Sequence, residues 1–439
     1  MEGLKEQILQ LTERFLKDSG VEVWIEFEKG SSIERRDKAD FLKENYQEVS
    51  VTFRYLKNGK IGLSYATSLD AKCLEIAYER AKTLAENGVS GIFPEEKDFP
   101  FLSPPPLYFP DLKKVEEEFL SLEEKIFKEF KNIKRIEKLK FSIEEQNLFL
   151  LKKDLILSWI QPVYDFFISV VAEGKKEASS YEWVETIDFY EINFWEKAKR
   201  ACEKARILSQ TKKGKSKKCP VILPPEIGVD FLEILSFSFL GDEVIKGRSK
   251  LKDKLGKKVF SEKVNIIDSG IEDGLPETRP FDDEGAPQRR RRLVEKGVIK
   301  EFIFDTYWGS IARKQGIENA ISGNARRPDF TSFPKVSTTN FYVEKGEEDI
   351  KEILKHGEFF EVLEVLGTHT ADPISGDFSF GASGILYKNG EPVDYFSEVA
   401  ISGNIFEVFE SVIAVEKELT FYANFGIPTL VVEKIDIGG

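Results

Sequence analysis

Gly228-Val-Asp-Phe-Leu-Glu-Ile-Leu-Ser-Phe-Ser-Phe-Leu-Gly-Asp242 is the stretch on which the interpretation of this sequence depends. It follows a strand-like segment, Cys219–Leu223, and the pair Pro224-Pro225. Proline at the first helical position with an acid, here Glu226, in the first turn is typical of a helix start. Because the run is almost wholly apolar, we expect a helix that is buried in the core of its domain.

One carboxylate, that of Glu233, stands in the middle of this helix between Leu232 and Ile234. A lone acid in a buried segment costs several kcal/mol unless it is paired, hydrogen-bonded or protonated. One interpretation is structural: Glu233 faces a polar seam or reaches a buried arginine. The other is that Glu233 is a remnant of catalytic chemistry.

The pattern Gly-Val-x-x-Leu-Glu-x-x-x-Phe-x-x-x-Gly-Asp resembles the metal helix of the TldD/PmbA family, also called the "modulator of DNA gyrase" family. The resemblance implies a zinc-protease scaffold, since the protease branch carries His-Glu-x-x-x-His in this frame. There the histidines bind zinc and the glutamate acts as base. Here Leu232 and Phe237 stand at the histidine positions and only Glu233 is retained. Neither Leu nor Phe can ligate a metal, so the chain resembles the metal-less PmbA (TldE) branch.

Composition sets broader limits on the protein. The net charge of −13 over 439 residues argues against direct binding of nucleic acid, which needs clustered Lys and Arg. No segment has 18 uninterrupted apolar residues, so we expect no membrane span. Three scattered cysteines indicate neither a disulfide framework nor a metal site. The cytoplasm is the predicted compartment, and the richness in Lys and Glu suggests a thermophilic source.

The pattern of expected elements indicates a mixed α+β fold with two domains, 1–217 and 218–439. An amphipathic helix ending at Gly20 precedes strands, and Asn58-Gly59 marks a hairpin turn. Asp70 is expected to cap a helix to about Ala85. Strands followed by an Ala-rich helix occur twice, at 21–86 and 134–208, which makes an internal duplication of the N-terminal sheet-and-helix domain a hypothesis. The second domain is expected to be β-rich around the central helix.

Five short strands are expected in the second of these repeats: 135–143, 148–151, 155–160, 164–172 and 179–189. Residues 94–110 hold six prolines and are predicted to form a loop. The basic run 211–218 is interpreted as a solvated hinge rather than a binding patch.

The densest motif of the second half is Asp282-Asp283-Glu284-Gly285. Three consecutive acids could suggest a hard-cation site, but the spacing does not fit an EF-hand. The alternative is a turn whose acids cap backbone amides or pair with arginines such as those of Arg289–Arg292, which follow directly. Alternation along a strand puts Arg289 and Arg291 on one face and Arg290 and Arg292 on the other, with a hairpin turn at Glu295–Gly297.

Further motifs resemble the family in the expected order along the chain. Gly323-Asn324-Ala325-Arg326-Arg327 is similar to its Gly-Asn-x-Arg loop, and Thr338–Asn340 to its Thr-Asn strand entry. Gly376-Asp377-Phe378-Ser379 lies in a segment similar to its Asn-Pro-x-Thr-Gly-Asp-Phe-Ser element. The resemblance covers essentially the whole chain, weakly over 40–90 and specifically over 224–439.

A zinc site within this chain is not expected. The two histidines, His356 and His369, are 13 residues apart along the chain and could form a site only by a coincidence of the fold. The protease branch also uses a late cysteine, and the corresponding segment Ala423–Gly426 has none. We therefore expect no cofactor here, and zinc only in a partner subunit.

Three hypotheses follow for function. The first is a non-catalytic subunit that pairs with a metal-bearing TldD-like homologue and helps to bind unfolded or small peptides for proteolysis and peptide maturation. Its candidate groove residues are Asp282, Asp283, Glu284, Gly285, Gly323, Asn324, Gly376, Asp377, Phe378 and Ser379, and the isolated chain is expected to form a homodimer. The second is an independent peptidase that uses Glu233 and a site not recognised. The third is a regulatory binding protein acting on gyrase.

Overall fold

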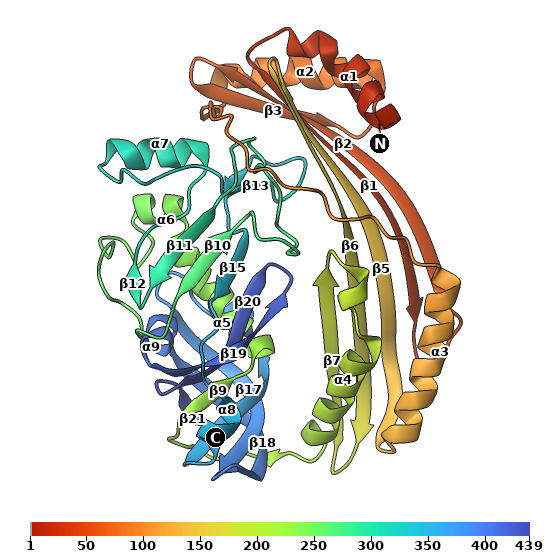
Figure 1. The fold of residues 1–439 in the computed structure, drawn as a ribbon, viewed down its shortest axis with the longest axis vertical. Helices are drawn as coiled ribbons and strands as arrows, with labels where there is room; N and C mark the ends of the chain where they lie inside the picture. The colour runs from red at the N-terminus through yellow and green to blue at the C-terminus, as the bar shows by residue number, and fades with distance from the viewer. Residues whose placement is uncertain (1) are drawn as a thin grey trace.

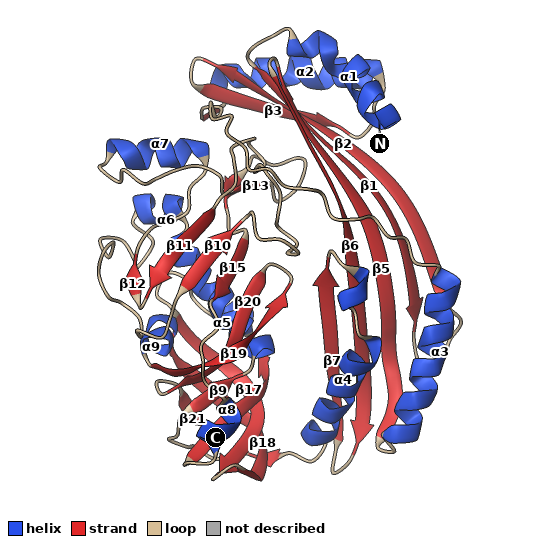
Figure 2. Cartoon of the chain, viewed as in Figure 1, coloured by secondary structure: helices blue, strands red, loops and turns tan. Residues whose placement is uncertain are grey.

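The computed structural model describes residues 2–439, which form two large β-sheets packed with helices (Figure 1). Helices and strands both contribute heavily (Figure 2), so the predicted α+β class is confirmed. The helices are α1 Glu2–Leu16, α2 Ala71–Leu84, α3 Leu112–Glu129, α4 Phe194–Leu208, α5 Pro225–Ser236, α6 Gly241–Lys246, α7 Thr306–Lys314, α8 Ile350–Leu354 and α9 Ile405–Glu410. Each helix of residues 2–439 falls short of the length and apolar content that crossing a bilayer requires.

The first sheet has seven strands in the order β4-β3-β2-β1-β5-β6-β7. Its strands are β1 Val21–Arg35, β2 Leu42–Lys57, β3 Lys60–Ala66, β4 Val89–Ser90, β5 Ile133–Lys152, β6 Leu155–Glu173 and β7 Glu177–Thr186. The order repeats one unit, helix–three strands–helix, on each side of the β1/β5 pair: α1-β1-β2-β3-α2 and α3-β5-β6-β7-α4. This arrangement supports the hypothesis of an internal duplication.

Several predicted features of this sheet agree with the structure. Asn58 and Gly59 adopt φ of 53° and 73° at the β2/β3 turn, and the Asp70 carboxylate accepts hydrogen bonds from the first amides of α2. Residues 94–110 are free of helix and strand.

The prediction of five short strands in 135–189 was wrong, because there are three long strands, two of them of 20 and 19 residues. The polar residues Glu144–Gln146, which lie between the expected strands 135–143 and 148–151, are instead within β5 on an incompletely buried part of the sheet.

The first sheet has one face covered by its own helices and one face turned to the second half of the chain. On the covered face, Phe53 and Ile25 pack with residues of α1 and α2, and Phe166 packs with residues of α3 and α4. On the other face, Trp24 packs against Phe281 with ring centroids 6.5 Å apart. The long strands curve around the second half of the chain (Figure 1).

The second sheet runs β12-β11-β10-β15-β20-β9-β16-β17-β18-β21, with β19 on β20 and β8 on β18. Its strands are β8 Lys212–Lys213, β9 Val221–Leu223, β10 Ile266–Ser269, β11 Arg290–Glu295, β12 Val298–Ile299, β15 Asn340–Val343, β16 Glu358–Leu366, β17 Asp377–Lys388, β18 Glu391–Asn404, β19 Val412–Tyr422, β20 Phe425–Val432 and β21 Asp436–Gly438. A separate pair, β13 Ala325–Arg326 and β14 Lys335–Val336, lies outside it. Although the predicted domain division is at 217/218, β8 precedes that point and already pairs with β18.

The core of the second half surrounds α5. Phe231, Leu232 and Leu235 are at most 1% exposed and belong to one large apolar cluster with residues of β17, β18 and β20. Gly228 allows α5 to approach β20, because a Cβ at this position would lie 3.1 Å from a methyl carbon of Ile427. The predicted central helix is therefore present, but it ends at Ser236, and a 3₁₀ turn over Phe237–Phe239 separates it from α6.

Candidate functional site

Helix α5 presents one apolar face to the core and one polar edge to the outside. Glu233 is exposed, in contrast to the expectation that the whole helix is buried. The reason is amphipathic spacing: positions 227, 228, 231, 232 and 235 are buried, whereas 230 and 233 follow the opposite edge. Within residues 2–439, no hydrogen bond or ion pair joins the Glu233 carboxylate to another side chain, so of the structural alternatives the one with a buried arginine partner is wrong. We call Asp230 and Glu233 the α5 edge.

The α5 edge lies between two hollows of the surface. The outer cavity, of about 410 Å³, is lined by the α5 edge with Ile234 and by Thr368, His369, Ala371 and Pro373. The inner cavity, of about 140 Å³, lies between the two sheets. Its walls come from β7, α4, α5, β16 and β19, and Asp230 lines both cavities. Burial, aided by the charge of Glu233, raises the pKa of Asp230 to about 6.

The residues at the positions that the resemblance assigns to zinc ligands do not fit a zinc ion. Leu232 is 0% exposed in the apolar core, and Phe237 is partly buried in the 3₁₀ turn after α5. The turn Ala423-Asn424 that joins β19 to β20 offers no thiol. His369 lines the outer cavity with the α5 edge, whereas His356 lies near the end of α8. Over residues 2–439, no three His, Cys, Asp or Glu side chains are grouped so that they could hold a metal ion.

The acidic motif Asp282–Gly285 is buried and its carboxylates are bonded within the chain. Asp282 accepts hydrogen bonds from the amides of Glu284 (2.9 Å), Ala286 (2.9 Å) and Ala325 (3.0 Å). Burial, together with the charge of Glu284, raises the pKa of Asp282 to about 7. These contacts correspond to the interpretation of a turn whose acids cap amides.

The neighbouring acids of this motif bind arginines from outside the Arg289–Arg292 run. Asp283 accepts from the amide of Arg327 at 2.6 Å and pairs with Arg279. Glu284 accepts from the amide of Thr306 at 3.0 Å and pairs with Arg54 of the first sheet at 3.2 Å. At Gly285, φ is +77°, and a Cβ would lie 3.0 Å from Leu150. The motif therefore joins the two sheets.

The Arg289–Arg292 run alternates along β11 as predicted. Arg290 and Arg292 both bind Glu344, whereas Arg291 is buried and donates to the Asn324 side chain at 2.8 Å. Arg289 pairs with Glu96 of the proline-rich loop. The turn of this hairpin is at Lys296-Gly297, with φ of 47° and 76°.

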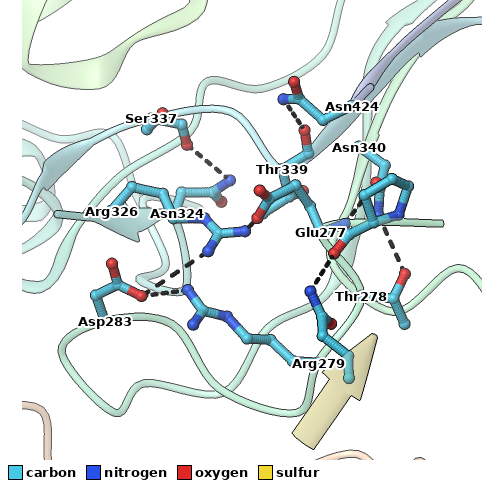
Figure 3. A network of polar contacts seen from close by, with 12 residues as sticks. Glu277, Thr278, Arg279, Asp283, Asn324, Arg326, Ser337, Thr339, Asn340 and Asn424 are labelled. Atoms are coloured by element: carbon cyan, nitrogen blue, oxygen red, sulfur yellow. Dashed lines mark hydrogen bonds and ion pairs between the residues drawn. The ribbon is translucent and has the colours of Figure 1, made fainter. Parts of the chain in front are cut away.

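Asn324 is part of a buried polar network that links its loop to strand β10 and to the start of strand β15 in the second sheet (Figure 3). Its amide nitrogen donates to Asp268 at 2.6 Å, and Thr339 donates to the same carboxylate from its amide (2.7 Å) and its hydroxyl (2.9 Å). Gly323 has φ of +122°, and a Cβ there would lie 2.4 Å from the Pro287 carbonyl oxygen. In the same view, Arg279 and Arg326 converge on Asp283.

Sequence reasoning missed Asp268 and Arg279, which are central to this network. Asp268 follows Ile266-Ile267 within a short buried strand, and an acid in such a segment is the signal that could have revealed it.

The Gly376–Ser379 element attaches β17 to α5. Gly376 has φ of +76° and its amide donates to the Asp372 carbonyl at 2.7 Å. Phe378 is buried with its ring centroid 5.1 Å from that of Phe231, whereas Asp377 and Ser379 are exposed on the opposite face of the strand. Of the candidate groove residues, these two are the ones with exposed side chains.

The inner cavity is the part of the site that sequence reasoning did not find. It brings Glu182 of β7 and Lys204 of α4 to Glu226 and Asp230 of α5, which are between 22 and 48 residues away along the chain. Beside it, β7 is the last strand of its sheet and, among residues 2–439, pairs with β6 alone, so its outer edge carries backbone groups outside the ladder. Neither histidine takes part in a side-chain hydrogen bond with a Ser, Thr or Cys in the described chain. The arrangement can thus hold charged groups and extended backbone, and it lacks a nucleophile–base pair of the serine or cysteine type.

Comparison with known proteins gives consistent matches. Residues 216–439 match the family described as "PmbA/TldA metallopeptidase C-terminal domain". An uncharacterized protein of Methanocaldococcus jannaschii is 27% identical over 379 residues, 82% of either chain. A protein named metalloprotease TldD homolog, from Buchnera aphidicola, is 28% identical over 314 residues, 65% of this chain and 64% of that protein. The crystal structure of TldE from Thermococcus kodakarensis has a TM-score of 0.85 at 20% identity and covers 99% of this chain and 100% of its own, which shows a shared fold.

Proposed function

This chain belongs to the PmbA/TldD family of metalloprotease homologues, and from that premise we propose that it is a PmbA/TldE-like subunit without a metal site of its own. In this proposal it pairs with a metal-bearing TldD-like homologue. It then holds unfolded or small peptides in extended form while the partner cleaves them.

One observation carries the proposal: α5 resembles the family's metal helix in its frame and in Glu233, but the positions that the resemblance gives to histidines hold Leu232 and Phe237. Leu232 is packed at 0% exposure, so the position is part of the apolar core. A catalytic zinc needs three protein ligands and an open position, which apolar side chains cannot provide.

The peptide-holding part of the proposal is supported by the free edge of β7 and the adjacent inner cavity. An extended peptide can add to a sheet edge by main-chain hydrogen bonds, which depend little on its side chains. Ser180–Trp183 of this edge also line the cavity, so a peptide on β7 would place side chains in it.

The test compares the chain alone and with its TldD-like homologue from the same cell. We expect the pure chain to carry zinc far below one ion per chain and to leave an unfolded peptide uncleaved, whereas the mixture cleaves it. Mass measurement should show a homodimer alone and a mixed complex with the homologue. Stoichiometric zinc with cleavage by the chain alone would overturn the proposal.

Glu233→Gln provides the control against an independent peptidase. If the chain cleaved peptides through Glu233, this variant would lose that activity in isolation. We expect the isolated chain to show no peptidase activity with or without this substitution. The mixture that contains the variant should cleave the peptide at a rate within about twofold of the mixture with the original chain.

A further inference from the structure

The charged residues around the inner cavity are balanced to a large extent within the chain. Glu182 lies 3.4 Å from the Lys204 ammonium and 3.8 Å from that of Lys197. Glu226 lies 3.5 Å from the same Lys204 and 3.1 Å from Arg200. These ion pairs account for two acids of the lining and for its cation.

The other two acids of the lining are Glu364 and Asp230. The charges of Lys204 and Lys176 act on Glu364, which also accepts a 3.4 Å hydrogen bond from the Ser383 hydroxyl. Asp230 lines the outer cavity as well and is open to solvent on that side. An occupant of the inner cavity is therefore not required to bring a charge, and the apolar part of the lining decides what fits.

The apolar part of the lining comes mainly from three strands. Its side chains are those of Tyr181 and Trp183 on β7, Leu363, Val365 and Leu366 on β16, and Tyr422 on β19. The cavity volume of about 140 Å³ is close to the ~150 Å³ of an apolar cavity that takes up benzene. The inner cavity thus has room for one aromatic ring or one branched aliphatic side chain.

Two side chains of this lining are exposed although they are large and apolar. Tyr181 of the first sheet is 57% exposed, and Leu366 of the second sheet is 63% exposed. The Tyr181 ring stacks on that of Phe167 with centroids 5.8 Å apart, and the rings of Trp183 and Tyr422 lie 5.6 Å apart between centroids. Both sheets therefore present apolar surface at the cavity that residues 2–439 do not cover.

The backbone beside this apolar surface indicates the kind of occupant independently. β7 is an edge strand, and β16 pairs with β9 only at Phe360 and Glu361, so among residues 2–439 no strand lies beside Leu363–Leu366 on that side. An extended peptide added to β7 has alternate side chains on the face that carries Tyr181 and Trp183. The cavity is thus bordered by a backbone edge with which a peptide can pair and by apolar groups that the peptide's side chains can cover.

We propose that the inner cavity selects a large apolar side chain, aromatic or branched aliphatic, from an extended peptide that pairs with β7. The peptide residue two positions away shares the face of Tyr181 and Trp183, whereas the residue between them lies on the face of Glu182, where polar side chains are tolerated. This inference rests on the proposed function and deepens it, because it gives the held peptides an apolar–polar–apolar pattern at β7.

The experiment is titration calorimetry of the full chain with five acetylated heptapeptide amides built on serine and threonine. Four of them carry one residue type at both the third and the fifth position: leucine, phenylalanine, glutamine or lysine. The last carries leucine at the third and fourth positions. We expect the alternating leucine or phenylalanine peptide to bind at least about tenfold more tightly than the glutamine peptide, because binding removes apolar surface from water. The peptide with adjacent leucines should lose most of that gain, since neighbouring side chains of a strand point to opposite faces.

The variants Tyr181→Thr and Leu366→Thr should each weaken binding of the preferred apolar peptide by about threefold to tenfold and leave binding of the glutamine peptide unchanged. Each removes apolar surface and keeps a residue that suits a strand. Tyr65→Thr and Val393→Thr are the matched controls, because Tyr65 on β3 and Val393 on β18 are 46% and 49% exposed and do not line the cavity. The affinity of both control variants should be unchanged. Melting temperatures check that every variant is folded.

The outcomes separate the two proposals. If all five peptides bind equally, or if the lysine peptide binds most tightly, the apolar pocket is overturned while peptide holding stands. The same conclusion follows if Tyr181→Thr and Leu366→Thr both bind the apolar peptide like the original chain. If no peptide binds, this inference is overturned and the peptide-holding role fails with it, whereas complex formation with the homologue is judged by mass.

Discussion

Glu22 of β1 and Arg54 of β2 lie directly opposite each other in the first sheet, and the Arg54 Nε donates to the Glu22 carboxylate at 2.6 Å. Their side chains are 0% and 2% exposed. Glu22 also lies 3.0 Å from the Lys152 ammonium and 3.5 Å from Arg327, which comes from the second half of the chain. One carboxylate thereby contacts three cations at the junction of the two sheets, and these cations hold the pKa of Glu22 below its usual range despite burial.

Glu22→Gln should destabilise the protein by about 3–5 kcal/mol, because it removes the carboxylate that three buried cations share and leaves Glu284 as the remaining partner of Arg54. The measurement is the denaturant concentration at the midpoint of unfolding, compared between variants whose unfolding free energy has the same slope against denaturant concentration. Glu86→Gln is the control, since the Lys57–Glu86 pair is exposed and worth less than about 1 kcal/mol. Equal effects of the two substitutions would contradict the assigned role of Glu22.

Glu28 and Glu185 should make the protein less stable as the pH rises from about 5 to 8. Burial raises the pKa of each to about 7, with further contributions from the charge of Glu144 at both sites. When a carboxyl group has a higher pKa in the folded state than in the unfolded state, its contribution to stability is greatest at a pH below the unfolded-state pKa. That contribution is lost as the pH rises through the folded-state pKa. Glu28→Gln and Glu185→Gln should each raise stability by about 1 kcal/mol near pH 8, after allowance for partial exposure, and by almost nothing near pH 5. Urea midpoints at both pH values test this, and a gain independent of pH would refute it.

Gly297→Ala should cost several times more stability than Gly59→Ala. Both glycines have left-handed φ, +76° and +73°, which costs an alanine about 1–2 kcal/mol. At Gly297 a Cβ would also lie 2.2 Å from the Phe260 carbonyl oxygen, whereas at Gly59 nothing lies within 4 Å. The difference in melting temperature between the two variants isolates this contact. Similar decreases in melting temperature for the two variants would mean that the backbone at Phe260 moves away from the new Cβ at little cost.

Asp268→Asn should destabilise the protein by about 1–3 kcal/mol, because one of its new amide hydrogens would face donors that now bind the carboxylate. Those donors are the Thr339 amide and hydroxyl and the Asn324 amide. Asp329→Asn, in an exposed loop, serves as the comparison and should change the unfolding free energy far less. If the two variants unfolded at the same denaturant concentration, the network would not be an important source of stability.

Local signals in the sequence were sufficient for turns, caps and the central helix. Asn58-Gly59 and the Asp70 cap depend on neighbouring residues alone, so they could be predicted without tertiary information. The extent of β5 could not, because Glu144–Gln146 resembles a turn unless the environment of that part of the sheet is known.

The candidate site also has features that the local sequence predicts and features that depend on the tertiary structure. The frame of α5 is visible in the sequence, but which edge is exposed depends on how Gly228 and Phe231 dock on β20 and β17. The inner cavity forms from five elements of both halves, and no local pattern links Glu182 to Tyr422. The acids Asp282–Glu284 were visible as a motif, yet their partners Arg54 and Arg279 come from elsewhere in the fold.

The pairing of β8 with β18 has a practical consequence for anyone dissecting this polypeptide. Lys212 and Lys213 are hydrogen-bonded into the second sheet, and Lys217 bridges to Ile437 near the C-terminus. A fragment beginning at residue 218 would lack that flanking strand and leave part of β18 open to intermolecular pairing. Truncations intended to stay monodisperse should therefore start upstream of Thr211.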